Sequence, residues 1–100
     1  MSQVDLLDAL AVWYEAKHAA AAGEGIQVAF GRTEGDRPKH SAWVNLECQE
    51  RLGELIVWDT GEAEYLTGRE GEPEVMEHLQ IDDLAQLHET LERLVESIGT

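Results

Sequence analysis

Histidine and cysteine are the residue types in this chain that could most readily bind a metal or attack a substrate, and their arrangement favours neither. The histidines are His18, His40, His78 and His88, which lie on separate predicted elements and form no metal-binding motif. Cys48 lacks a basic signature nearby and falls on the inward side of a predicted strand, which favours an inert core thiol. We therefore expect no catalytic residues, no metal site, no cofactor and no enzyme activity.

Carboxylates dominate the chemistry of the chain. There are 21 Asp and Glu residues against 7 Lys and Arg, which gives a formal net charge of −14. Because 43% of the residues are hydrophobic and fall in regular patterns, this charge indicates an acidic folded domain rather than disorder. Such a field repels nucleic acid and anionic membranes and attracts basic surfaces. The composition thus predicts a binding protein for a basic partner, although solubility alone would also explain the acidity.

Apolar residues at helical spacing predict a helix near each end of the chain. The first spans about residues 2–22, with Ser2 as its N-cap and Gly23 as its natural stop. The second spans about residues 82–98 and is capped by Asp82. The apolar stripe of the second helix is formed by Leu84, Leu87, Leu91, Leu94 and Ile98. Each helix therefore has one side to bury against the rest of the fold.

Between the helices, the hydrophobic period changes to two, which is typical of strands. Strands are predicted at about 26–30, 40–48, 53–59 and 63–67, with a short fifth strand at about 75–79. Short connections favour pairing between successive strands, and the two helices can cover one face of the resulting sheet. We expect an α+β fold over residues 1–100 as a single domain. It is a two-layer sandwich in which an antiparallel four- or five-stranded meander is flanked by an N-terminal and a C-terminal helix.

The two faces of this sheet are expected to differ in chemistry. The face under both helices is aliphatic and consists of Val28, Val44, Leu46, Leu55 and Val57. The opposite face combines aromatic and acidic side chains, and Asn45, Glu47 and Leu66 share it. Tryptophan is enriched in binding hot spots and carboxylates attract a basic surface, so we predict that this face binds a protein. The predicted partner-binding residues are Trp43, Glu54, Ile56, Trp58, Glu62 and Glu64, with Glu70, Glu72 and Glu74 from an acidic loop at 69–74.

Two alternatives to this surface remain open. One or both tryptophans could instead pack in the core, under the acidic loop or against the first helix. The assignment of faces also depends on strand register, because a slip of one residue exchanges the two faces.

The chain shows no pattern of a secreted or membrane-spanning protein. No basic segment followed by an apolar stretch marks a signal peptide, and no apolar run approaches the roughly 20 residues that span a bilayer. The single cysteine excludes an intramolecular disulfide, which fits a reducing compartment. We expect a cytoplasmic protein that is a monomer rather than an obligate oligomer and that binds neither membrane nor nucleic acid.

The segment Leu55–Glu64 resembles bacterial immunity proteins of the TriTu type. It reads as a strand that ends in Trp58-Asp59-Thr60-Gly61, followed by a returning strand with an acid. Aromatic residues near Trp13, the strand at 44–47 and the leucine-rich last helix extend the resemblance over most of the chain. The resemblance implies a toxin inhibitor in a polymorphic toxin system for interbacterial competition, of the kind served by type VI secretion.

The cognate toxin that this resemblance implies is an ADP-ribosyltransferase that modifies elongation factor Tu. The immunity protein would bind this toxin domain and block access to its NAD or target site. The Trp58–Glu64 motif, which carries the resemblance, serves either toxin contact or folding.

Other classes of protein share some of these features. An acidic secretion chaperone is also small and α+β, but it would be a dimer that holds an effector segment in extended form. An enzyme would need an acidic residue paired with a histidine in a pocket. A nucleic-acid mimic would need carboxylates in two regular rows, which the acids clustered at 54–74 do not show.

Overall fold

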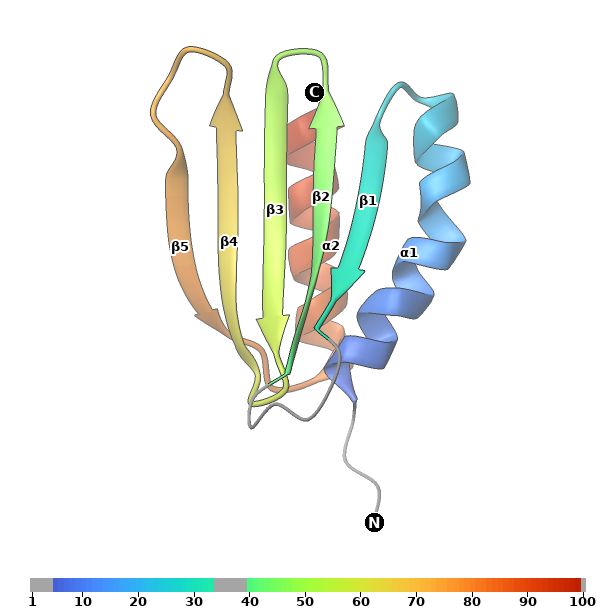
Figure 1. Ribbon diagram of the computed structural model, residues 1–100, viewed down its shortest axis with the longest axis vertical. Helices are drawn as coiled ribbons and strands as arrows, with labels where there is room; N and C mark the ends of the chain where they lie inside the picture. The colour runs from blue at the N-terminus through green and yellow to red at the C-terminus, as the bar shows by residue number, and fades with distance from the viewer. Residues whose placement is uncertain (1–4, 34–39, 100) are drawn as a thin grey trace.

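The fold is a single antiparallel sheet with a helix before it and a helix after it. The structure is a computed structural model that describes residues 5–33 and 40–99. Its elements are α1 (Leu6–Gly23), β1 (Gln27–Arg32), β2 (Ser41–Cys48), β3 (Arg51–Trp58), β4 (Glu62–Arg69), β5 (Val75–Gln80) and α2 (Leu84–Gly99). The five strands pair in the order β1-β2-β3-β4-β5 (Figure 1). The predicted α+β meander is confirmed, and its fifth strand is present.

Both helices lie on the same side of the sheet. Figure 1 views the sheet face-on, with α2 behind its central strands and α1 along the β1 side. Ala42, Val44, Leu46, Leu55, Val57, Ala63 and Tyr65 point from the sheet into the core and are at most 4% exposed. They meet Leu6, Leu7, Leu10 and Trp13 of α1 and Leu87, Leu91, Leu94 and Ile98 of α2. The predicted aliphatic face is therefore the covered face, with Val28 half-buried at its edge.

Strand register assigns every strand residue to one face or the other. Val44 pairs with Leu55, and Leu55 pairs with Tyr65, so these three side chains lie together under the helices. Trp43 pairs with Ile56 on the opposite face. Because side chains alternate along a strand, this pairing fixes the division of faces that the sequence predicted.

Both helices begin later than the sequence predicted. α1 is capped by Asp5, whose Oδ1 accepts hydrogen bonds from the backbone N–H groups of Leu7 at 3.0 Å and Asp8 at 3.1 Å. Asp5 satisfies the first free amides, so the helix begins at Leu6; the predicted cap, Ser2, lies outside the described residues.

The second helix is capped one residue beyond the predicted position. Asp83, rather than Asp82, accepts the hydrogen bond of the Gln86 N–H at 2.8 Å. Leu84 was predicted to start the buried stripe but is 39% exposed. Ile81, which precedes the cap, is 2% exposed and fills this end of the core instead.

The two helices are buried unevenly along their lengths. The buried residues of α1, from Leu6 to Trp13, all lie in its first half. Those of α2 run from Leu87 to Ile98 along almost the whole helix. The second half of α1, which contains the alanines at 19–22, therefore contributes less to the core than any comparable stretch of α2.

Candidate functional site

The face of the sheet opposite the helices is the candidate site, and we call it the open face. No described helix covers it (Figure 1). Its central residues are Trp43, Asn45 and Glu47 of β2, Leu52, Glu54, Ile56 and Trp58 of β3, and Glu62, Glu64 and Leu66 of β4. Most of these side chains are half-buried by their neighbours, and none belongs to the core.

Apolar and acidic side chains are adjacent across the strands of the open face. In one row, Trp43 pairs with Ile56, Ile56 with Glu64, and Glu64 with His78 of β5. In the next row, the residues in order are Asn45, Glu54, Leu66 and Met76. Paired side chains across antiparallel strands have Cβ atoms about 4.5–5.5 Å apart. A partner that contacts this face therefore meets apolar anchors and carboxylates together.

The indole of Trp43 lies across the neighbouring strand rather than in the core. A Cβ atom at its partner Gly31 would lie 2.3 Å from Cε2 and Cζ2 of the indole. The glycine leaves room for the ring, which shields the backbone of β1. Trp43 is half-buried on the open face, whereas Trp13 is the tryptophan that belongs to the core.

The second tryptophan of this face borders a hollow of about 420 Å³ at the start of β4. The hollow is lined by Trp58, Glu62, Ala63, Glu64, His78 and Leu79. His78 Nδ1 lies 3.7 Å from Glu64 Oε1, so a protonated imidazole would form an ion pair there. An aromatic wall beside carboxylates suits a side chain that has an apolar stem and a positive end.

The carboxyl of Glu54 on the open face is influenced by two other carboxylates, one on β4 and one just before β5. Burial raises the pKa of the Glu54 carboxyl, and the negative charges of Glu74 and Glu64 raise it further. Desolvation and like charge both disfavour the ionised form. A cation brought by a partner would relieve this repulsion, so the group is suited to receive Lys or Arg.

The described strand positions of the open face carry neither lysine nor arginine. Arg32 faces α1 and lies 2.6 Å from Asp8, and Arg93 of α2 binds Glu77 through two hydrogen bonds of 3.0 Å. The field of the open face is therefore set by its carboxylates.

The predicted partner-binding residues do not form one cluster. Glu64 and Glu74 are close enough to Glu54 for their charges to raise its pKa, while Trp58 and Glu62 lie toward one end of the sheet. Glu70 and Glu72 are exposed in the β4–β5 connection at the other end, the length of β4 away, or about 25 Å. A single partner would have to span most of the sheet to touch them all.

Sequence reasoning missed several residues of this face. β3 begins at Arg51, two residues earlier than predicted, and this adds Leu52. Met76 and His78 join from β5, and Met76 is 54% exposed. The sequence places Met76 and His78 on one face of a short strand and Glu77 on the other. Only the pairing of β5 with β4 shows that Met76 and His78 belong to the open face.

Within residues 5–33 and 40–99, no three His, Cys, Asp or Glu side chains are grouped so as to hold a metal ion. None of the helices described here is long and apolar enough to cross a membrane.

Comparison with known proteins identifies a family. The family model described as "Immunity protein TriTu" matches residues 8–97. This match spans all five strands and most of both helices. No curated protein and no solved structure matches the chain significantly.

Proposed function

The chain belongs to the TriTu family of immunity proteins, and from this premise we propose that its open face binds and inhibits an ADP-ribosyltransferase toxin. Immunity proteins bind a cognate toxin and neutralise it, so the partner is a protein. The proposal adds which toxin is bound and by which surface. In this proposal the toxin modifies elongation factor Tu, and the immunity protein blocks access to its NAD or target site.

The composition of the open face is the main reason to propose it as the toxin-binding surface. It presents two tryptophans and four strand carboxylates, with no Lys or Arg among its described strand residues. Charge complementarity raises the rate of encounter, while aromatic residues supply affinity once water has been excluded. Fast association matters here because the toxin must be neutralised before it acts.

The chemistry of the proposed substrate supports the same choice. NAD carries an anionic pyrophosphate, so an enzyme that binds it needs positive charge in its pocket. Glu54, Glu64 and Glu74 are complementary to such a pocket. Trp58 and Ile56 lie on the same face and can cover apolar surface beside it. The open face could thereby compete with the dinucleotide for the same positive groups.

Co-expression with the protein encoded by the neighbouring upstream gene tests this function. Growth rescue and co-purification of a stable complex are expected from the unmodified chain. Glu54→Lys combined with Glu64→Lys should abolish rescue because it reverses charge at the centre of the open face. The matched control is Glu15→Lys with Glu89→Lys, which changes the net charge equally at exposed helix positions.

The outcomes separate the alternatives. Equal loss of rescue in both variants would show that rescue depends on the net charge of the chain and not on the open face. A toxic neighbour that is neither bound nor neutralised would refute the immunity function for that pair. A harmless neighbour held as an unfolded segment by a dimer would identify a secretion chaperone.

A further inference from the structure

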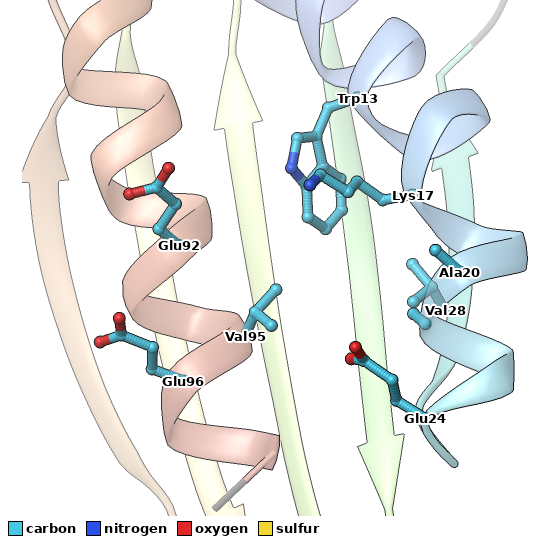
Figure 2. Close-up of a pocket in the computed structure, with 9 residues that line it drawn as sticks. Trp13, Lys17, Ala20, Glu24, Val28, Glu92, Val95 and Glu96 are labelled. Carbon is cyan, nitrogen blue, oxygen red and sulfur yellow. The ribbon is translucent and has the colours of Figure 1, made fainter.

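A second surface lies on the helical side of the molecule, away from the open face. A groove of about 310 Å³ runs between α1 and α2 (Figure 2). It is lined by Trp13, Lys17, Ala20, Ala21, Glu24, Val28, Glu92, Val95 and Glu96. The open-face residues are separated from it by the sheet, so the two surfaces can be occupied at the same time.

The groove exists because small side chains of α1 face α2. The leucines in the first half of α1 are packed into the core, but its second half has no fully buried residue. Ala20 and Ala21 are too short to fill the space beside Val95, which is only half-buried. The indole of Trp13 lies between the helices at one end of the groove, as Figure 2 shows. The floor is therefore aromatic and aliphatic.

The rim of the groove is mainly acidic. Glu24 lies just beyond the end of α1, and Glu92 and Glu96 lie across the groove on α2, with their carboxylates toward the edge of α2 away from α1 (Figure 2). Glu92 and Glu96 are one helical turn apart, a spacing at which like charges repel. Lys17 is the one basic residue among the groove-lining residues that the structure describes. Three carboxylates around an apolar floor favour an occupant that is positively charged and partly apolar.

We propose that this groove docks a basic peptide segment of a partner protein, in which Arg or Lys residues flank a large apolar side chain. The apolar side chain would rest on Trp13, Val28 and Val95. The flanking cations would reach Glu24 on one side and Glu92 and Glu96 on the other. The groove volume is at the lower end of the range for ligand pockets, which fits one large side chain and not a folded domain.

The negative charge around the groove disfavours other kinds of ligand. An anionic ligand would be repelled by the rim. A second copy of this chain carries the same net charge of −14, so self-association through the groove would bring like charges together. A basic segment is the occupant that the rim and the floor attract together.

The three tryptophans allow a direct test by nitrogen-15 NMR, because each indole N–H gives its own signal. Trp13 reports on the groove, and Trp43 and Trp58 report on the open face. The probe is a short synthetic peptide with a central Phe flanked on both sides by Arg residues. Saturable movement of the Trp13 signal is expected at peptide concentrations that leave the Trp43 and Trp58 signals in place, because the open face also attracts cations but does not contain the apolar floor of the groove on which the central Phe would rest. The same peptide with Ala in place of Phe should bind at least about tenfold more weakly because it leaves the floor uncovered.

Paired variants make the result specific to the groove. Glu24→Lys with Glu92→Lys should weaken peptide binding about tenfold or more, whereas Glu15→Lys with Glu50→Lys, at exposed positions outside the groove lining, should weaken it less than about threefold. The same spectra show whether each variant remains folded. An unmoved Trp13 signal, movement of the open-face tryptophans instead, equal binding of the Ala peptide, or equal loss in both variants would overturn the proposal. None of these results bears on toxin neutralisation by the open face, because the assay contains no toxin.

Discussion

The two faces of the sheet are formed by the same five strands but differ in composition and burial. The covered face is aliphatic, and its central residues Val44, Leu55 and Val57 are 0% exposed beneath the helices. The open face alternates with it residue by residue but carries tryptophans and carboxylates that are half-buried or exposed. Burial of apolar surface stabilises the fold, whereas in the proposed function the open face is covered only when the toxin binds. Neighbouring residues on one strand should thus affect different properties.

Adjacent residues of β3 provide the largest expected contrast. Leu55→Ala removes a fully buried side chain and should lower the free energy of unfolding by about 2–5 kcal/mol. Ile56→Ala, one position along on the half-buried open face, should lower the free energy of unfolding by only about 1 kcal/mol and should weaken toxin binding. Urea denaturation of both variants makes the comparison. Similar losses of stability would show that the open face is part of the folding core.

Packing between Gly31 and Trp43 should give the next largest effect. Gly31→Ala places a methyl group where the indole lies, so the ring must move. The expected loss of unfolding free energy is about 1–3 kcal/mol. Most of that loss should disappear when Trp43 is also replaced by Ala, as a double-mutant cycle in urea would show. An unchanged penalty in that background would mean that the glycine is needed for another reason.

A carboxylate on the covered side of β5 should stabilise the fold. Arg93 donates two hydrogen bonds to the carboxylate of Glu77, and these bonds lower the pKa of Glu77. The guanidinium of Arg93 also lies 4.5 Å from the centre of the Tyr65 ring. The ion pair contributes its full stabilisation above pH 4.5, the ordinary pKa of a glutamate. This stabilisation is lost as the pH falls through the lower pKa that Glu77 has in the folded protein. Denaturation from pH 6 downwards should show Glu77→Gln less stable than the parent protein at pH 6, with the difference shrinking below about pH 4.5. A difference that does not change with pH would exclude the ion pair as its cause.

The carboxylate of Glu54 on the open face should behave in the opposite way. Because its pKa is raised in the folded protein, its ionised form disfavours folding at neutral pH. Glu54→Gln should therefore raise the free energy of unfolding at pH 7 by less than about 1 kcal/mol, while toxin binding becomes weaker. The gain should fade as the pH falls through the raised pKa toward 4.5, where Glu54 itself becomes protonated. Loss of stability at pH 7 would contradict the proposed repulsion among Glu54, Glu64 and Glu74.

The sequence predicts the division of faces because the period of a strand is two. The alternation in 42–48 and 54–58 already separates aliphatic residues from tryptophans and acids, so the helices can cover only one of the two sets. The helix caps were less predictable, because Asp82 and Asp83 are adjacent and both can cap a helix. Only the path of the backbone after Ile81 decides between them.

Contacts between different strands could not be predicted in the same way. The position of Trp43 over Gly31 depends on the register between β1 and β2, which no local pattern encodes. The approach of Glu74 to Glu54 depends on how the β4–β5 connection returns to the sheet. The groove between the helices depends on where α1 leaves the core, and the alanines at 19–22 indicate only that the helix can form.

The central claim is that the open face contacts the toxin, and association kinetics test it most directly. The association rate of purified toxin domain would be measured with the parent chain, with Glu54→Lys/Glu64→Lys, and with Glu15→Lys/Glu89→Lys, at low and at physiological salt. The open-face variant should associate at least about tenfold more slowly, with a weaker dependence on salt, while the control stays close to the parent. Equal rates for the two variants would contradict the claim and place the toxin on another surface.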